Sequence, residues 1–202
     1  MAEAKGDKTP YSIQQFIYRG NWSADELMSV QYTTGRDEIL LASHEGKCIR
    51  FSEENVRKTG RGTQGVRSIK LGDQDYVVDV TVIQDGYEVL TVSENGYGKR
   101  SDLEDYRLQS RAGKGIKAGQ FNEKTGKLIN LKLIDPENDI MIIADNGIII
   151  RMRAKEVSKI SRDTQGVRMM RLKNEGKVVC VALTPPEAEE IDEGGEGESS
   201  AE

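Results

Sequence analysis

Apolar and polar residues alternate with a period of two along much of the chain, which is typical of a β-strand with one buried and one exposed face. Clear examples are YVVDVTVI at 76–83, LINLKLI at 128–134 and VVCVALT at 178–184. No long segment places apolar residues every three to four positions, so helix is expected to be minor. The sequence therefore predicts an all-β fold.

The same pattern returns about every 50 residues. The turns HEGK, ENGY and DNGI place their glycines at Gly46, Gly96 and Gly147, each between two short apolar runs. This arrangement is typical of a β-hairpin, because the central residues of its tight turn need positive φ. A polar connector and a basic turn follow, then a third run such as GVRSIKL at 65–71 and a fourth, alternating run. We therefore expect four strands in each repeat.

Four-stranded units that recur at 40–50 residues are typical of propeller blades. The run ELMSVQYT at 26–33 matches the last strand of a repeat, so 12–34 is interpreted as the last two strands of an earlier blade. We predict a partial β-pinwheel or propeller-like arc with about three complete blades plus part of a preceding one. The expected divisions are an N-terminal segment with a partial blade at 1–34, blade repeats at 35–84, 85–135 and 136–184, and a disordered acidic tail at 185–202.

The formal net charge of −5 is unevenly distributed along the chain. From Glu187 to the end there are eight acidic residues and no basic one. The other 26 acidic residues face 29 Lys and Arg, so the rest of the chain carries about +3. The tail is either a solubilising extension or an internal competitor for a basic, anion-binding surface.

An arginine-flanked turn recurs with the repeat, as RGTQGVR at 61–67, RAGKGIK at 111–117 and RDTQGVR at 162–168. With a further arginine on the hairpin, nine basic residues keep three positions in three repeats. Charges on exposed strand faces are the ordinary explanation for any one of them. A belt of positive charge at evenly spaced blade edges would suit a polyanion such as a DNA duplex. The nine are Arg50, Arg100 and Arg151 on the hairpins, Arg61, Arg111 and Arg162 at the start of the turns, and Arg67, Lys117 and Arg168 at their ends.

The middle turn is extended to QSRAGKG at 109–115, with an additional Gly-Lys pair. Gly113 and Gly115 leave the backbone bare, so that amide N–H groups could approach a phosphate, although a plain tight turn also accounts for them. The segment is not a nucleotide-binding P-loop, because Gly115 stands where Ser or Thr should follow the lysine.

These motifs resemble the C-terminal β-pinwheel domain of the bacterial DNA gyrase A subunit. The resemblance runs from about residue 25 to residue 183, in the order of the last three blades of that domain. It rests on DELMSVQYTTGRDEILLASHEGKCIRF, RGTQGVRSIKLG, NGYGKR, SRAGKG and RDTQGVR. The topoisomerase IV A subunit has a similar domain, in which a seven-residue motif of the family, the gyrase box, is eroded. The NGYGKR and TQGVR stretches favour gyrase.

The resemblance implies DNA binding at the outer rim of the pinwheel. QSRAGKG is similar to the seven-residue gyrase box, Gln-Arg-Arg-Gly-Gly-Lys-Gly, and departs from it at Ser110 and Ala112. In the family the full box lies in the first blade, which we expect this chain to lack, so strong DNA wrapping does not follow. The matching box residues are Gln109, Arg111, Gly113, Lys114 and Gly115.

The sequence does not predict an enzyme. In the gyrase A subunit the strand-breaking tyrosine lies in an N-terminal region with a long coiled coil, and no sustained heptads occur here. His44 is the only histidine and is expected to be an exposed turn residue, so it forms no triad or metal site. Cys48 and Cys180 are interpreted as buried thiols in a reducing cytoplasm, and no cofactor or metal is expected. No apolar run approaches 18 residues, and the N-terminus has no signal-peptide pattern.

The expected partner is double-stranded DNA, in the bacterial cytoplasm at the nucleoid, with the gyrase A and B subunits as candidate protein partners. One alternative is a protein–protein scaffold that docks on or regulates gyrase or topoisomerase IV, and another is a truncated remnant. The aromatic residues of the N-terminal segment would seal the open blade edge or form a homodimer contact there. These residues are Tyr11, Phe16, Tyr18 and Trp22.

Overall fold

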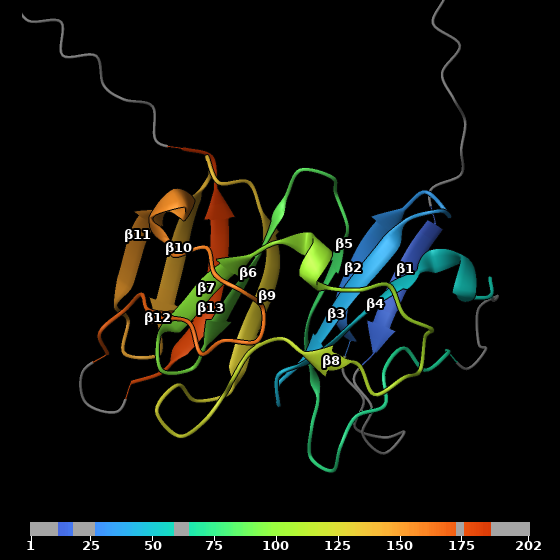
Figure 1. Cartoon of the computed structure of the whole chain (residues 1–202), viewed down its shortest axis with the longest axis horizontal. Coiled ribbons are helices and arrows are strands. Elements are labelled where there is room, and N and C mark those ends of the chain that lie inside the picture. Colours follow the sequence, from blue (N-terminus) through green and yellow to red (C-terminus); the bar gives the residue numbers. More distant parts are fainter. Residues whose placement is uncertain (1–11, 18–26, 59–64, 173–175, 187–202) are drawn as a thin grey trace, which may run out of the picture.

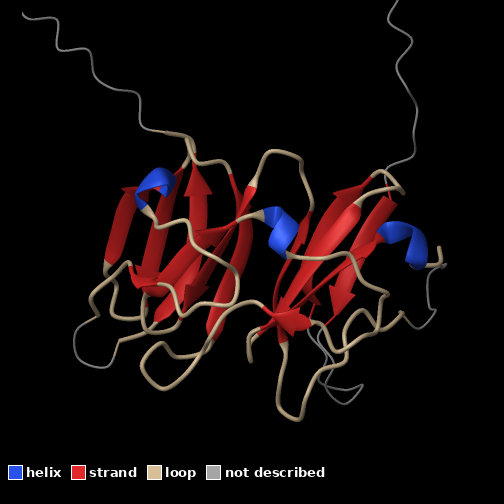
Figure 2. Cartoon of the chain, in the orientation of Figure 1, coloured by secondary structure: helices blue, strands red, loops and turns tan. Residues whose placement is uncertain are grey.

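The computed structural model describes residues 12–17, 27–58, 65–172 and 176–186. Strands dominate this part of the chain, and its helical structure is limited to three short 3-10 turns (Figure 2). The expectation of an all-β fold is therefore confirmed. The 3-10 turns are η1 (Glu53–Asn55), η2 (Leu103–Asp105) and η3 (Ala154–Glu156).

The strands form antiparallel sheets that lie side by side as blades (Figure 1). From its inner to its outer strand, the first blade runs β5-β3-β4-β8, the second β9-β6-β7-β12 and the third β13-β10-β11. The partial blade is the pair β1-β2. The strand bounds are β1 (Ser12–Ile17), β2 (Leu27–Thr33), β3 (Glu38–Ser43), β4 (Lys47–Ser52), β5 (Val77–Val82), β6 (Glu88–Ser93), β7 (Tyr97–Ser101), β8 (Ile116–Lys117), β9 (Leu128–Ile134), β10 (Asp139–Ala144), β11 (Ile149–Arg153), β12 (Val167–Arg168) and β13 (Val178–Thr184).

The outermost strand of the first and second blades comes from the next repeat. β8 belongs to the second repeat but pairs with β4, and β12 belongs to the third repeat but pairs with β7. The connector after β7 crosses to the first blade, where the Gln109 N–H donates to the Arg50 carbonyl at 2.8 Å. Our prediction that each repeat forms its own third strand is therefore wrong. In the first repeat the segment 65–71 contains no strand.

Two glycines of the repeated turn allow this docking. Gly115 and Gly166 have φ values of +68° and +83°, in the left-handed region that side chains disfavour. A Cβ atom on Gly115 would lie 2.4 Å from the Cys48 carbonyl oxygen, and one on Gly166 would lie 2.8 Å from that of Gly98. Gly65 holds the same position in the first repeat, but a Cβ atom there would have nothing within 4 Å, and no strand follows directly. The glycines thus serve strand docking between repeats.

The apolar core lies between the blades. Leu40 and Ala42 on β3 share a buried cluster with Leu131 and Leu133 on β9, so the first blade packs against the second. The second blade packs against the third in a cluster of the same kind, which contains Leu90, Val92 and Val181. Each blade thus has a near face toward the preceding blade and a far face toward the following one.

The structure corrects two expectations about single residues. Cys180 is exposed, and of the two cysteines only Cys48 is buried. Burial raises the pKa of the Cys48 thiol to about 12. His44 is partly buried rather than exposed, because its ring stacks on Tyr76 with the centroids 4.5 Å apart and its Nε2 lies 3.5 Å from a Glu94 carboxylate oxygen. Arg61, Tyr11, Tyr18, Trp22 and the acidic tail from Glu187 lie outside the described residues.

Substitution of the docking glycines tests the exchanged strand. We expect Gly115→Ala and Gly166→Ala each to lower the free energy of unfolding by at least about 2 kcal/mol, because they combine left-handed strain with a backbone clash. Gly65→Ala is the matched control from the first repeat and should change stability little. Urea unfolding of the three variants measures the difference, and equal effects at all three positions would contradict this account.

Candidate nucleic-acid interface

The hairpin arginines Arg50, Arg100 and Arg151 form ion pairs within their own blades. The Nε atom of Arg50 lies 2.5 Å from a Glu38 carboxylate oxygen, and Nη1 of Arg100 lies 2.6 Å from one of Glu88. Nε of Arg151 is 2.8 Å from an Asp139 oxygen. In each case the two residues belong to adjacent strands of one hairpin, so the positive charge is neutralised locally.

Two of these arginines also hold the 3-10 turn of the next repeat. Arg50 donates to the carbonyls of Leu103 and Tyr106 at 3.2 and 3.3 Å. Arg100 donates to Val157 and Lys155 in the same way, at 2.8 and 3.1 Å. The side chain of Arg100 is only 10% exposed. These side chains therefore clamp neighbouring repeats together and leave few donors for a phosphate.

The arginines that open the basic turns link consecutive turns. Nε of Arg111 donates to the Asn55 carbonyl at 3.2 Å, and its Nη1 donates to that of Arg67. Arg162 repeats this arrangement one blade later: its Nε donates to the Asp105 carbonyl at 3.0 Å, and its Nη1 donates to the Lys117 carbonyl. Each opening arginine thus fixes the backbone of the residue that closes the preceding turn.

Two of the residues that close the turns, Lys117 and Arg168, are exposed on outer strands. Lys117 on β8 lies directly opposite Lys47 on β4, and both side chains are exposed. Like charges at a cross-strand position repel each other unless an anion lies between them. Arg168 on β12 packs over the Tyr97 ring at 5.3 Å and donates to its hydroxyl at 2.8 Å. This edge of the blades is suited to an anionic ligand.

The box-like segment lies beside these residues. Lys114 is exposed, and the Gly113 carbonyl accepts from the N–H of Lys70, another exposed lysine. Ala112 has a φ of +67°, a conformation that favours glycine, which is the residue that the family's box carries there. Gln109 is held by its backbone bond to Arg50, and its side-chain nitrogen is buried. Lys114 is therefore the residue of this segment best placed to meet a phosphate.

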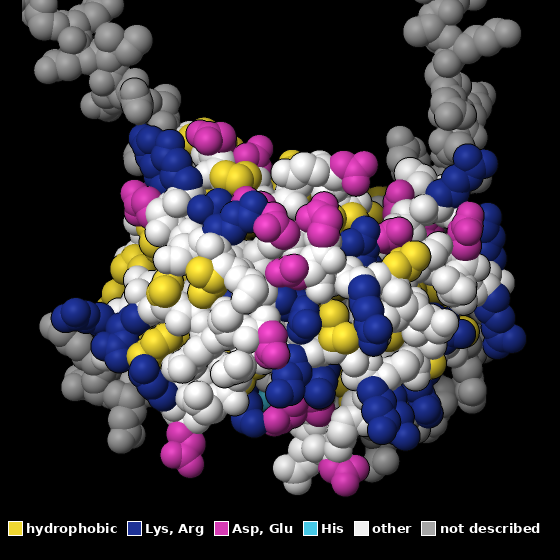
Figure 3. All heavy atoms as spheres, in the orientation of Figure 1, with side chains coloured by type: hydrophobic (Ala, Val, Ile, Leu, Met, Phe, Trp, Pro, Cys, Tyr) yellow, Lys and Arg dark blue, Asp and Glu magenta, His cyan; other side chains and the backbone are white. Residues whose placement is uncertain are grey.

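The exposed cations form a discontinuous group. Lys and Arg side chains predominate over Asp and Glu in the lower half of the face shown in Figure 3, around the region where Figure 1 places β8 and β12. Within the described ranges, none of the six cations of this group forms an ion pair. Lys47 and Lys70 were missed by the sequence analysis because neither position is basic in all three repeats: Lys47 corresponds to Tyr97 and Ile148, and Lys70 to Gln120 and Arg171. The six are Lys47, Arg67, Lys70, Lys114, Lys117 and Arg168.

A buried lysine fixes the last basic turn. Nζ of Lys99 donates to the carbonyls of Thr164 and Ser161 at 2.8 and 3.3 Å, and also to that of Arg162. Burial lowers the pKa of Lys99 to about 8, against the opposing effect of Asp163. The other two repeats carry an isoleucine at this position, so the third basic turn is anchored by a cation that the repeat pattern does not predict.

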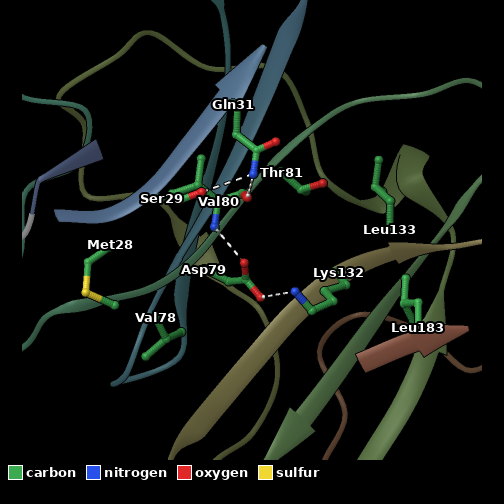
Figure 4. A pocket seen from close by; sticks show the side chains of 10 residues that line it. All are labelled: Met28, Ser29, Gln31, Val78, Asp79, Val80, Thr81, Lys132, Leu133 and Leu183. Carbon is green, nitrogen blue, oxygen red and sulfur yellow. Dashed lines mark hydrogen bonds and ion pairs between the residues drawn. The ribbon is translucent and has the colours of Figure 1, made fainter. Parts of the chain in front are cut away.

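A cavity of about 310 Å³ lies between the inner strands β2, β5, β9 and β13 (Figure 4). Asp79 points into it, 3.5 Å from the Lys132 ammonium and 2.6 Å from the Asn130 amide nitrogen. Burial raises the pKa of Asp79. Among the described residues, no second carboxylate, histidine or thiol lines the cavity.

The described ranges offer neither a metal site nor a membrane-spanning helix. No group of three or more His, Cys, Asp or Glu side chains there could hold a metal ion. No helix in the same ranges is long and apolar enough to cross a membrane.

Comparison with known proteins gives consistent results. A family model described as "DNA gyrase C-terminal domain, beta-propeller" matches residues 37–84, 87–135 and 138–185. The chain is 38% identical over 159 residues to the DNA gyrase A subunit of Ureaplasma parvum, and 40% identical over 171 residues to that of Staphylococcus aureus. These alignments cover 79% and 84% of this chain and 19% of each relative. The chain thus spans about a fifth of the length of these relatives.

Two solved structures are similar to the fold. A DNA gyrase A C-terminal domain aligns with a TM-score of 0.73 and 27% identity, over 79% of this chain and 54% of the other. The C-terminal domain of DNA topoisomerase IV aligns with a TM-score of 0.76 over 82% of this chain and 52% of the other. Its identity of 20% indicates a shared fold only.

The clamp role of the hairpin arginines is testable by stability. We expect Arg100→Gln to lower the free energy of unfolding by about 3 kcal/mol, because it removes the ion pair with the partly buried Glu88 and the bonds to the next repeat, and leaves Glu88 with the more exposed Lys159 at 3.0 Å. The equivalent Arg50→Gln should cost less, since the Arg50 side chain is 19% exposed against 10% for Arg100. Thermal and urea unfolding would measure both, and a larger loss at Arg50 would contradict the clamp model.

The anchor at Lys99 predicts a pH dependence. The ordinary lysine pKa of 10.5 falls to about 8 in the folded chain, so the unfolded chain binds this proton more tightly. The free energy of unfolding should therefore rise with pH between about 8 and 10.5. Lys99→Met removes this contribution, so the stability of the wild type relative to the variant should increase over that window. Urea unfolding at several pH values measures it, and a constant difference would contradict the prediction.

Proposed function

The chain belongs to the DNA gyrase C-terminal domain family of β-propellers, and on this basis we propose that it binds duplex DNA along the outer strands of its blades. The resemblance expected from the motifs is thereby confirmed. The match concerns the C-terminal domain of the gyrase protein, not its catalytic region. We therefore assign the chain a supporting, non-catalytic role in a type II topoisomerase of the bacterial cytoplasm.

The observation that carries the proposal is the cross-strand pair Lys47 and Lys117. Two exposed ammonium groups face each other across β4 and β8 without a carboxylate partner, in the part of the chain that the structure describes. Lys114 lies two residues before β8 and adds a third unpaired cation. A phosphate that neutralises such a group releases counterions and relieves the repulsion.

The mechanism follows from where these cations lie. The outer strands of the first and second blades each carry one closing basic residue, Lys117 on β8 and Arg168 on β12, and the opening arginines fix the spacing between turns. A duplex that follows successive outer strands would meet cations at each blade and curve around the arc. Contacts with phosphates carry no base information, so sequence selectivity should be weak.

Fewer residues contact DNA in this proposal than the sequence suggested. Arg67, Lys114, Lys117 and Arg168 are retained, and Lys47 and Lys70 are added to the group. The side chains of Arg50, Arg100, Arg111 and Arg162 are assigned to contacts that hold the repeats together, and that of Arg151 to an ion pair with Asp139 inside its own blade. Gly113, Gly115, Lys114 and Gln109 shape one turn, in which Lys114 is the contact residue. Arg61 stays a prediction.

Duplex-DNA binding at a series of salt concentrations tests the function. We expect the affinity to fall steeply with salt, and Lys114→Ala with Lys117→Ala to reduce the slope of log K against log salt by about 2, because about 0.9 counterion is released per contact. Truncation after Thr184 removes the acidic tail and should raise the affinity. Fluorescence anisotropy of a labelled duplex measures all three effects.

The matched control is the double variant Lys155→Ala with Lys159→Ala. These lysines are also exposed, but both form ion pairs. Lys155 lies in η3 and pairs with Glu137, and Lys159 follows η3 and pairs with Asp102 and Glu88. The control should bind DNA as the wild type does. No binding even at low salt, or equal losses in both double variants, would refute the DNA interface. Binding that does not change with salt would favour the alternative scaffold role.

A further inference from the structure

The partial blade exposes an apolar face whose counterparts in other blades are buried. Val30 and Tyr32 on β2 are 46% and 73% exposed. Leu131 and Leu133 hold the same repeat positions on β9, and both are buried in the contact between the first and second blades. Val30 and Tyr32 therefore form a near face without a preceding blade among the described residues.

The third blade exposes the opposite kind of face. Ile149 on β11 is 53% exposed, and Met141 and Ile143 on β10 are only partly buried. The residues in the corresponding positions of the second blade, Leu90 and Val92, are completely buried against the third blade. β11 lies at one side of the molecule, whereas β1 and β2 lie in the other half (Figure 1).

These two exposed faces correspond to the two halves of the contact that joins consecutive blades within the chain. We propose that two copies of this chain associate head to tail, with β2 of one copy packed against the third blade of the other. Leu40 and Ala42, the equivalents of Met141 and Ile143, already pack against Leu131 in one buried cluster. The intermolecular contact would continue the packing between blades. Such a contact is heterologous, because different surfaces of the two copies meet.

The repeat also predicts which side chains meet across this contact. Within the chain, the Asp79 carboxylate of the first blade accepts from the Asn130 amide of the second at 2.6 Å. Cys180 holds the position of Asp79, and Ser29 holds that of Asn130. Cys180 is exposed and lies opposite Ile143 in the ladder between β10 and β13, so both side chains lie on the far face of the third blade. Head-to-tail packing therefore brings Cys180 of one copy next to Ser29 of the other.

A disulfide cross-link tests this geometry directly. Under mild oxidation, Cys180 of one Ser29→Cys copy should form a disulfide with the new thiol at position 29 of the next copy. Because each copy carries both thiols, the products should be a ladder of linked oligomers or closed rings. Cys48 is buried and does not compete. Ser110→Cys is the control, since its exposed position lies on neither end, and it should stay unlinked under the same conditions. Linked dimers of the double variant Ser29→Cys with Cys180→Ser would indicate a symmetric contact and overturn the proposal.

Sedimentation of the intact chain gives the second test. The mass of the wild type should increase with concentration, whereas Val30→Lys and Ile149→Lys should each remain monomeric. An equimolar mixture of the two variants retains one intact end of each kind, and it should form dimers and nothing larger. This recovery also shows that both variants are folded. Leu108→Lys alters a side chain that is 54% exposed away from both ends, and it should behave like the wild type.

Two outcomes would contradict the proposed contact. One is a wild type that stays monomeric at every concentration, and the other is a mixture of the two end variants that forms no dimers. Wild-type monomers that bind a different blade-containing protein, and lose that binding in Val30→Lys, would assign the face to that partner instead. The test is independent of DNA binding, because it alters none of the cations at the outer strands.

Discussion

The docking of a short strand from one repeat onto the blade before it holds the repeats together. It requires the backbone of Gly115 to approach the Cys48 carbonyl more closely than any side chain would permit. A repeat of this size cannot bury its apolar faces alone, so stability comes from the contacts between neighbours. The same docking brings Lys117 to the outermost strand, opposite Lys47. The order of the blades and the position of the cations thus have one common origin.

The basic residues of the repeat divide into two kinds. The guanidinium group carries five donors in a planar fork, so Arg100 can bind Glu88 and two carbonyls of the next repeat together. Such arginines are largely withdrawn from solvent and hold the repeats at a fixed spacing. Lys114 and Lys117 have no carboxylate partners within the described segments, and they supply the charge that a phosphate would meet. Positively charged residues therefore support both the scaffold and the proposed interface.

Residues that depart from the repeat pattern also form contacts between neighbouring repeats. Lys99 stands where the other repeats have isoleucine, and it anchors the third basic turn through three carbonyls. His44 corresponds to Glu94 of the next repeat, and the two side chains lie 3.5 Å apart at the hairpin turns. A repeat pattern records what its copies share, so it does not predict these contacts. In the sequence they were visible only as exceptions, without a partner to explain them.

The strands, the hairpin turns, the repeat and the family could all be predicted from the amino-acid sequence. Period-two alternation and turn glycines such as Gly96 are local properties, and they act through backbone conformation and the burial of one strand face. The folded chain was needed to find that the strand Ile116–Lys117 joins the preceding blade, that Arg100 points into a contact between repeats, and that Cys180 is exposed. These features depend on hydrogen bonds and packing between segments about 50 residues apart. Such partners are selected by the geometry of the assembled blades, which no local pattern encodes.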